Sequence, residues 1–204
     1  EIIKNSSKIM NLLKRTISIV SAIAISASIV ISAMAAGFTD VSEQSPYYDA
    51  ISYTSEAGIF SGISDTEFAP DVQLTRGMYV TLLGKVYFHL KGDFGAPSNP
   101  VAETGFLDVS PDDYYGPSVC WAWKNEIVSG YDDDIFAPND VLTKEQAISI
   151  LYRYSNFSND NLLSGENTNI LSYEDYSDIS KYAIPAIQWG LENQILTDDG
   201  DKIN

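Results

Sequence analysis

Few residues of this chain are of a type that performs catalysis. The chain has one cysteine, Cys120, and one histidine, His89. Cys120 lies between apolar neighbours, which favours a small buried hydrophobic residue, and His89 has no ligand-type residue beside it. The sequence contains no Walker loop, no G-x-S-x-G elbow, no Cys–His pair and no zinc-binding pattern. It therefore predicts neither an enzyme nor a protein with a cofactor.

Two runs of aspartate are the remaining candidates for a metal site, at 132–134 and at 198–201. Neither follows the ligand spacing of a calcium-binding helix–loop–helix, so we interpret both as solvated turns. A glycosidase would need a defined pair of carboxylates. Among the 28 acidic residues no motif singles out such a pair.

The overall charge excludes two classes of partner. With 28 acidic and 12 basic residues, the chain carries a formal charge of −16. Such a surface repels both nucleic-acid phosphates and anionic lipid headgroups. A hydrophobic content of 45% is sufficient for a packed core, and a lone cysteine allows no intramolecular disulfide.

A repeated unit organises the chain. A shift of 68 positions places Phe38 on Phe106, Asp40 on Asp108 and Ile59 on Ile127. A second shift of 68 places Trp189 on Trp121. Self-similarity at such a period predicts supersecondary units that bury their apolar faces against their neighbours.

Each unit predicts two helices joined by a turn. In the first unit we expect a helix over 48–57 that Gly58 stops, and a second helix that Thr75 caps. In the second unit Pro117 suits the first position of a helix, while Thr143 and Gln146 form a capping box. The second helices carry apolar residues at helical spacing, namely Tyr79, Leu82, Leu83 and Val86 in the first unit and Ala147, Ile150, Leu151 and Tyr154 in the second.

A third unit is expected to open at Tyr176, two residues shorter before its helix, with Pro185 in the place of Pro117. It reaches Asn204 where the turn before a second helix would follow, so we interpret it as a partial unit. The apolar face of its helix comprises Ile184, Ile187, Leu191 and Ile195. We expect the protein to be less stable, or to self-associate, without a second helix over this face.

The N-terminal 35 residues are typical of an export signal, with residues 1–9 as possible upstream sequence before Met10. Lys14 and Arg15 precede an apolar run over 17–33, and Ala-Met-Ala ends at Ala35. The run is short for a membrane span of about 20 residues. We therefore expect cleavage after Ala35 and no stable membrane insertion afterwards.

The repeated motifs resemble the S-layer homology domain, a module of bacterial surface proteins usually found in three tandem copies. The resemblance is carried by F-x-D-V at 38–41 and 106–109 (weaker at 176–179), by F-x-P at 68–70 and 136–138, and by L-T-R or L-T-K at 74–76 and 142–144. It implies full units at 38–90 and 106–154 and a partial unit at 176–204. The fold it implies is all-α, with helix–loop–helix repeats packed as a pseudo-threefold bundle.

The function implied by this resemblance is non-catalytic anchoring of a secreted protein in the cell wall or S-layer. The expected partner is secondary cell-wall polysaccharide, commonly ending in pyruvylated N-acetylmannosamine. An arginine can bind a carboxylate through two hydrogen bonds, an aspartate can accept sugar hydroxyls, and an indole can cover an apolar sugar face. The candidate polysaccharide-binding residues, carried over by position, are Asp40, Gly62, Arg76, Asp108, Trp121, Gly130, Lys144, Asp178 and Trp189.

Alternatives remain open for these residues and for the function. The aspartates could cap helices or turns, and Trp121 and Trp189 could be core residues. Arg76 lies in the first turn of a helix, where the macrodipole disfavours a cation, and this favours an anionic partner. The alternative function is a protein–protein or self-assembly module of a surface layer, with other surface-layer proteins as partners.

Overall fold

The computed structural model describes residues 37–92, 105–158, 162, 165, 167–198 and 200–203. The expected export signal lies outside them. The described residues form α-helices and one short 3-10 helix, with no strand, which confirms the predicted all-α class. None of these helices is long and apolar enough to cross a membrane. The elements are α2 (Tyr48–Glu56), α3 (Arg76–Leu90), α4 (Gly116–Lys124), α5 (Lys144–Ser158), η1 (Tyr176–Asp178) and α6 (Ile184–Glu192).

The first helix of each unit ends in the same way. Two positions after the last helical residue, Gly58, Glu126 and Gln194 adopt left-handed backbone conformations with φ of 69°, 58° and 58°. These positions are 68 residues apart, as the sequence shift predicts. Only the first of the three is glycine, so the other two units accept the steric cost that an L-residue meets in this region.

The second helices begin at the predicted caps. Thr75 Oγ1 accepts a hydrogen bond from the Met78 amide at 3.3 Å. Thr143 and Gln146 form the reciprocal capping box, because each side chain accepts from the other residue's amide at 3.2 Å. These bonds satisfy amides at the start of α3 and α5 that would otherwise lack a partner.

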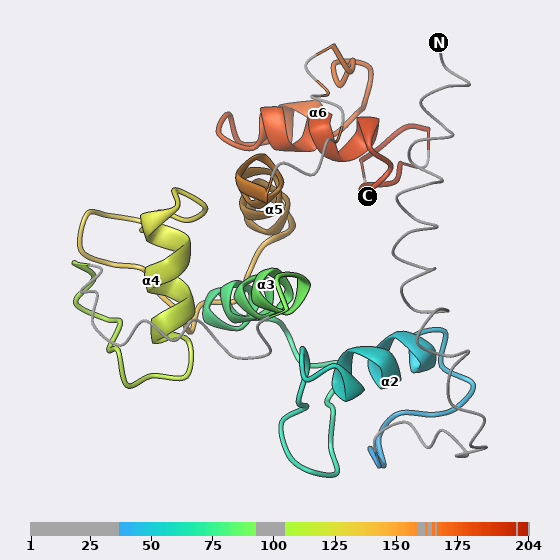
Figure 1. Cartoon of the computed structure of the whole chain (residues 1–204). Coiled ribbons are helices and arrows are strands. Elements are labelled where there is room, and N and C mark those ends of the chain that lie inside the picture. The colour runs from blue at the N-terminus through green and yellow to red at the C-terminus, as the bar shows by residue number, and fades with distance from the viewer. Residues whose placement is uncertain are drawn as a thin grey trace. The chain divides into compact units, whose positions relative to one another are not determined.

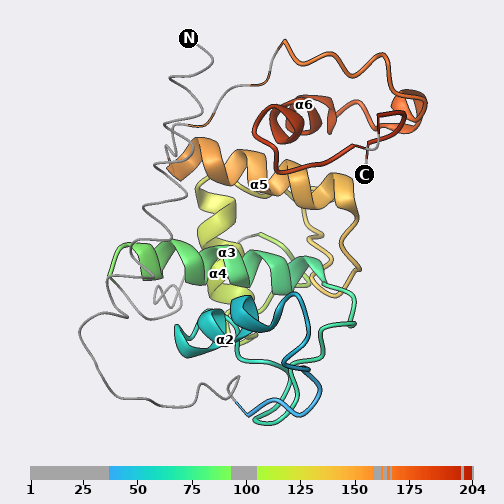
Figure 2. The same ribbon diagram turned by 90° about the vertical axis from the view of Figure 1, so that its right-hand side faces the viewer.

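Helix packing joins each unit to the next. The second helix of the first unit, α3, packs against α4 and α5, and α5 packs against α6 (Figures 1 and 2). In the described residues α2 has no helix packed against it. One core cluster lies around α3, α4 and α5, and a second lies between α5 and α6. Cys120 is buried in α4, as predicted.

The third unit has a different register from the one that the sequence predicts. The amide of Glu174 donates to the Asp201 carbonyl at 2.8 Å, as Leu107 does to Asp134 at 2.7 Å. Asp175 accepts from the Ile203 amide at 3.1 Å, 28 residues ahead. The hydrogen bonds that open the first two units therefore recur at Glu174 and Asp175, and not at the opening expected at Tyr176 with Asp178 as its aspartate.

The segment that makes these bonds is Tyr173-Glu-Asp-Tyr176, and it lies one residue further from the following helix than the opening of the second unit does, not two residues closer. A fixed shift of 68 misses this opening because the extra residue falls between the aspartate and the helix. The hydrogen bonds, which depend on the local fold and not on a constant spacing, identify it.

Candidate functional site

Two of the predicted aspartates clamp the F-x-P turns. Asp108 accepts hydrogen bonds from the amides of Phe136 at 2.9 Å and Ala137 at 2.6 Å. Ala137 has a φ of 57°, so the clamp holds a backbone conformation that alanine rarely adopts. Asp40 makes the same pair of bonds in the first unit, and the bond from the Phe68 amide lowers the pKa of Asp40. Both side chains therefore have the structural role that the sequence left open.

The two predicted glycines also belong to the turns. A Cβ atom on Gly130 would collide with the carbonyl oxygens of Asp132 and Ile135 and with the ring of Phe106. Gly62 occupies the equivalent place, with a φ of 66°. Each glycine thus allows its turn to close onto the opening aromatic residue of its unit.

The predicted tryptophans are core residues. Trp121 stacks among aromatic side chains of α3 and α5, with ring centroids 5.2 Å from Tyr87 and 5.8 Å from Phe157. Trp189 is 2% exposed and packs on Tyr152. The accessible indole is that of Trp123, which is 40% exposed. Two positions along a helix correspond to about 200° of rotation, so Trp123 faces away from the core that Trp121 enters.

Arg76 enters the turn of the second unit. It is 5% exposed. Its Nε donates to the Phe136 carbonyl at 3.0 Å, and its Nη2 donates to the Ser129 carbonyl at 3.1 Å. The guanidinium carbon lies 4.5 Å from the ring centroid of Tyr131 and 4.7 Å from that of Phe136. Backbone carbonyls and ring faces thus offset the unfavourable position of this cation at a helix N-terminus.

The backbone around Arg76 docks onto the same turn. The amides of Arg76 and Gly77 donate to the carbonyls of Asp140 and Pro138 at 3.0 and 2.8 Å. The amide of Leu142 donates back to the Leu74 carbonyl at 2.9 Å. First-turn amides of α3, which have no partner within their own helix, are therefore satisfied by the next unit.

A pocket of about 290 Å³ lies beside the Arg76 guanidinium, and we call it the arginine pocket. Arg153 of α5 also borders it. In the described residues neither arginine forms an ion pair with a carboxylate. Burial, assisted by repulsion from Arg153, lowers the pKa of Arg76. The pocket is lined by Arg76, Ser129, Gly130, Tyr131, Gln146, Ser149, Ile150, Arg153 and Tyr182.

One hydroxyl group in the arginine pocket is unsatisfied. Ser149 is 4% exposed, and its Oγ has no hydrogen-bond partner among the described residues. A buried hydroxyl without a partner is costly. Two cations and a free hydroxyl donor can together hold a carboxylate or another oxyanion.

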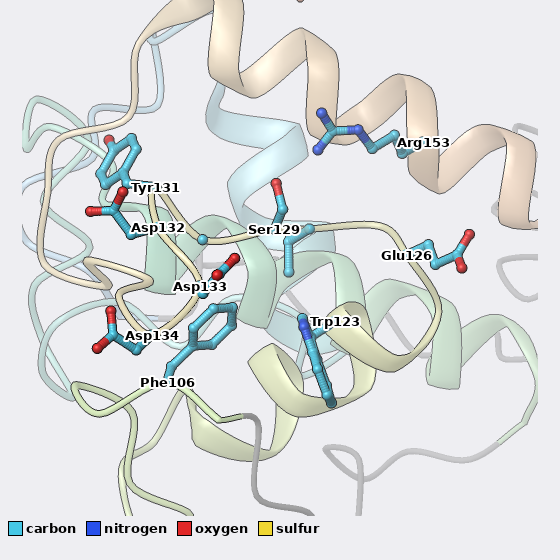
Figure 3. Close-up of a pocket in the computed structure, with 11 residues that line it drawn as sticks. Phe106, Trp123, Glu126, Ser129, Tyr131, Asp132, Asp133, Asp134 and Arg153 are labelled. Atoms are coloured by element: carbon cyan, nitrogen blue, oxygen red, sulfur yellow. The ribbon is translucent and has the colours of Figure 1, made fainter.

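A second, more open pocket of about 950 Å³ adjoins the first, and we call it the tryptophan pocket (Figure 3). Figure 3 shows Trp123 and Phe106 toward one side and Arg153 toward the other, with Ser129 between them. The two pockets share Ser129, Gly130, Tyr131 and Arg153. The lining of the tryptophan pocket is completed by Phe106, Trp123, Glu126, Val128, Asp132, Asp133 and Asp134.

Lys144, predicted as the counterpart of Arg76, lies in different surroundings. It is exposed and borders a third pocket, of about 250 Å³. Glu145, Asp175 and Asp178 line the same pocket. The structure therefore brings Arg76 and Gly130 together at one pocket, and Lys144 and Asp178 at another. Asp40, Asp108, Gly62, Trp121 and Trp189 line neither of these two.

Sequence reasoning missed Arg153 and Trp123, which line the first two pockets. Trp123 lies two positions after Trp121, which the motif comparison selected. Arg153 lies one position before Tyr154, which is buried in the core. Their signal is the helical period, which places them away from the buried stripe.

Comparison with known proteins identifies the two units. Residues 37–77 and 105–148 match the S-layer homology domain. The chain carries two S-layer homology domains. The first match extends to the Arg76–Gly77 segment, and the second spans the turn that receives it. S-layer homology domains are non-catalytic anchoring modules of bacterial cell-surface proteins, and they indicate a location in the cell wall or S-layer.

Similar proteins are found in several bacteria. A "Cell surface protein" of Thermoanaerobacter kivui is 29% identical over 72% of this chain and 19% of that protein. The "Surface-layer 125 kDa protein" of Lysinibacillus sphaericus is 50% identical over 28% of this chain and 5% of that protein. "Exoglucanase XynX" of Acetivibrio thermocellus is 28% identical over 66% of this chain and 11% of that protein. The matched regions thus span at most about a fifth of these relatives.

Proposed function

We propose that the chain binds an anionic sugar of secondary cell-wall polysaccharide in the arginine pocket and so anchors a protein to the bacterial wall. One observation carries the proposal. Arg76 and Arg153 border one pocket without a carboxylate partner, next to the unsatisfied hydroxyl of Ser149, in a chain of charge −16. An acidic protein has many carboxylates available, so two unpaired arginines side by side favour an anion from outside.

The chemistry suits a carboxylate held on a sugar, as in a pyruvylated N-acetylmannosamine. Arg76 has five donors, of which the Ser129 and Phe136 carbonyls occupy two. Arg153 can add a two-bond contact, because its guanidinium presents parallel donors. The Ser149 hydroxyl can donate a further bond. The names of the Thermoanaerobacter and Lysinibacillus relatives, a cell-surface and a surface-layer protein, support this role.

The proposal extends to the third unit and to the arrangement of all three. The bonds of Glu174 to Asp201 and of Asp175 to Ile203 repeat those of the two S-layer homology domains. We assign residues 173–203 to a third, partial domain of the same family. Successive packing of α3 on α4 and of α5 on α6 supports a pseudo-threefold arrangement of the units.

Sedimentation with purified cell wall tests the proposal. We expect the protein to sediment with wall that retains its secondary polymer and to stay in solution with wall that has been stripped of it. Arg153→Ala should weaken binding tenfold or more, because charge-assisted hydrogen bonds contribute about 1.5–3 kcal/mol each. Lys85→Ala is the matched control, since Lys85 holds the same place in α3 that Arg153 holds in α5.

Two results would contradict the proposal. Equal binding to stripped and intact wall would exclude the secondary polymer as the partner. Equal loss in Arg153→Ala and Lys85→Ala would show that general positive charge, and not the arginine pocket, determines binding. Sedimentation that rises with protein concentration and needs no wall would instead favour the self-assembly alternative.

A further inference from the structure

The tryptophan pocket adjoins the arginine pocket. Four residues, Ser129, Gly130, Tyr131 and Arg153, line both. A ligand that filled the arginine pocket would therefore have neighbouring space open to it on this side. The volume of about 950 Å³ is large enough for a further group of sugar size.

The floor of the tryptophan pocket is aromatic. The Trp123 ring meets the buried Phe106 ring edge to face, at a centroid distance of 6.3 Å and an angle of 69°. Trp123 stays 40% exposed, whereas Trp189 is buried and Trp121 packs against the core around α3, α4 and α5. An indole held in position and open to solvent provides an apolar platform with a hydrogen-bond donor at its edge. The C–H face of a sugar ring is a suitable partner.

The rim of the pocket is acidic. Glu126, Asp132 and Asp133 line it, and their carboxylates have no hydrogen-bond or ion-pair partner among the described residues. Carboxylates accept hydrogen bonds from hydroxyl groups, and they repel a second anion. The charge therefore changes across the two pockets, from Arg76 and the shared Arg153 to the carboxylates of Glu126, Asp132 and Asp133. A ligand that fits both has one anionic and one neutral, hydroxyl-rich residue.

We infer that the tryptophan pocket is a second subsite, which binds the neutral sugar residue next to the anionic one. The inference rests on the function proposed for the arginine pocket. It makes the recognised unit a disaccharide with a fixed direction: the anionic sugar lies between Arg76 and Arg153, and its neutral neighbour stacks on Trp123. Glu126, Asp132 and Asp133 accept the hydroxyl hydrogens of the neutral sugar.

Calorimetry with two probes tests the second subsite on the full chain. The first probe is the methyl glycoside of pyruvylated N-acetylmannosamine, and the second is the same sugar linked to a neutral N-acetylhexosamine. We expect the disaccharide to bind about five- to tenfold more tightly, the gain of one aromatic contact. Trp123→Ala should remove this gain and leave the affinity for the single sugar within about twofold of the parent.

A matched variant and a spectroscopic measurement complete the test. Tyr47→Ala removes another exposed aromatic residue, 66% exposed and outside both pockets, and should change neither affinity. The indole N–H resonance of Trp123, assigned with Trp123→Phe, should shift with the disaccharide and not with the single sugar. This measurement uses the unaltered protein, so it holds even if Trp123→Ala folds poorly.

The outcomes separate the two proposals. If the parent binds both probes equally and the Trp123 resonance does not respond, the second subsite is wrong and the arginine pocket stands. If Trp123→Ala lowers both affinities by the same factor, Trp123 supports the fold of the pocket and the second subsite is again wrong. If the parent binds neither probe, the function proposed for the arginine pocket fails, and the subsite fails with it.

Discussion

Arg76 combines two roles that the sequence presents as alternatives. It is a structural residue, because it joins the first S-layer homology domain to the turn of the second through two carbonyls and two rings. It also borders a pocket in which part of its guanidinium is available to a ligand. A single side chain thus couples the contact between domains to the proposed binding site.

Replacement of Arg76 should therefore affect stability as well as binding. Arg76→Ala leaves the Ser129 and Phe136 carbonyls without a donor and opens a cavity, so we expect a loss of about 3 kcal/mol in the free energy of unfolding. Lys144→Ala, at an exposed position, should change that free energy by less than about 0.5 kcal/mol. Urea titration measures both.

The affinity of the same two variants for cell wall should follow the same order, so that Arg76→Ala binds more weakly than Lys144→Ala. Binding is compared at a temperature where circular dichroism shows both to be folded. If folded Arg76→Ala binds wall polymer as well as the parent does, Arg76 is a structural residue alone.

Tyr79 should make the free energy of unfolding depend on pH in the alkaline range. Its hydroxyl donates to the Ala147 carbonyl at 3.3 Å, and burial raises the pKa of Tyr79 from 10.0 to about 12. Because the folded state holds the proton more tightly, this contribution to stability is complete below pH 10 and is lost as the pH rises through 12.

Tyr79→Phe should consequently cost about 1 kcal/mol at neutral pH, through the lost hydrogen bond. It should also make the free energy of unfolding fall less steeply between pH 10 and 12. Urea titrations at several pH values measure this slope. Tyr47→Phe, at an exposed tyrosine, should leave the slope unchanged, and an equal slope for Tyr79→Phe would contradict the prediction.

At the scale of the element, the aspartate clamp and the helix caps determine how each unit is built. The sequence predicts the helices and the capping box well, because these depend on neighbours within four residues. It does not predict that the opening bonds recur at Glu174 and Asp175, because the spacing there departs from 68 by one residue. The helical period places Arg153 and Trp123 away from the buried stripe, but it does not show that they line pockets, because the other lining residues come from segments distant in the chain.

The clamp distinguishes Asp108 from Asp178, which the F-x-D-V motif comparison treats as equivalents. Asp108→Ala removes the acceptor for the Phe136 and Ala137 amides, so we expect a loss of about 2 kcal/mol or more in the free energy of unfolding. Asp178 is exposed, and Asp178→Ala should have little effect. Thermal unfolding of the two variants compares them directly. Equal losses of stability in the two variants would instead support the third opening that the sequence predicts at Tyr176.

At the scale of the whole molecule, helix packing is uneven between the units. The helices α2 and α4 have the same length and the same place in their domains. The second is covered by α3, whereas α2 has no helix partner in the described residues. Local opening of a helix costs less free energy where fewer apolar contacts cover it.

Hydrogen exchange should reveal this difference. We expect the amides of α2, residues 48–56, to exchange at least tenfold faster than those of α4, residues 116–124, under native conditions, since about 1.4 kcal/mol less protection gives a factor of ten. Mass spectrometry after digestion resolves the two helices. Equal protection of α2 and α4 would show that α2 gains cover from another part of the protein or from a second copy.

The contact between Arg76 and the following turn has an evolutionary consequence. The Leu74–Gly77 segment of the first domain docks into the turn of the second domain, so the junction between them has a direction. A gene duplication that copies a whole unit keeps the contact between the start of a second helix and the following turn. A duplication that breaks a unit between its turn and its second helix must form a new contact. Inheritance in whole units is therefore the path with the lowest cost in stability.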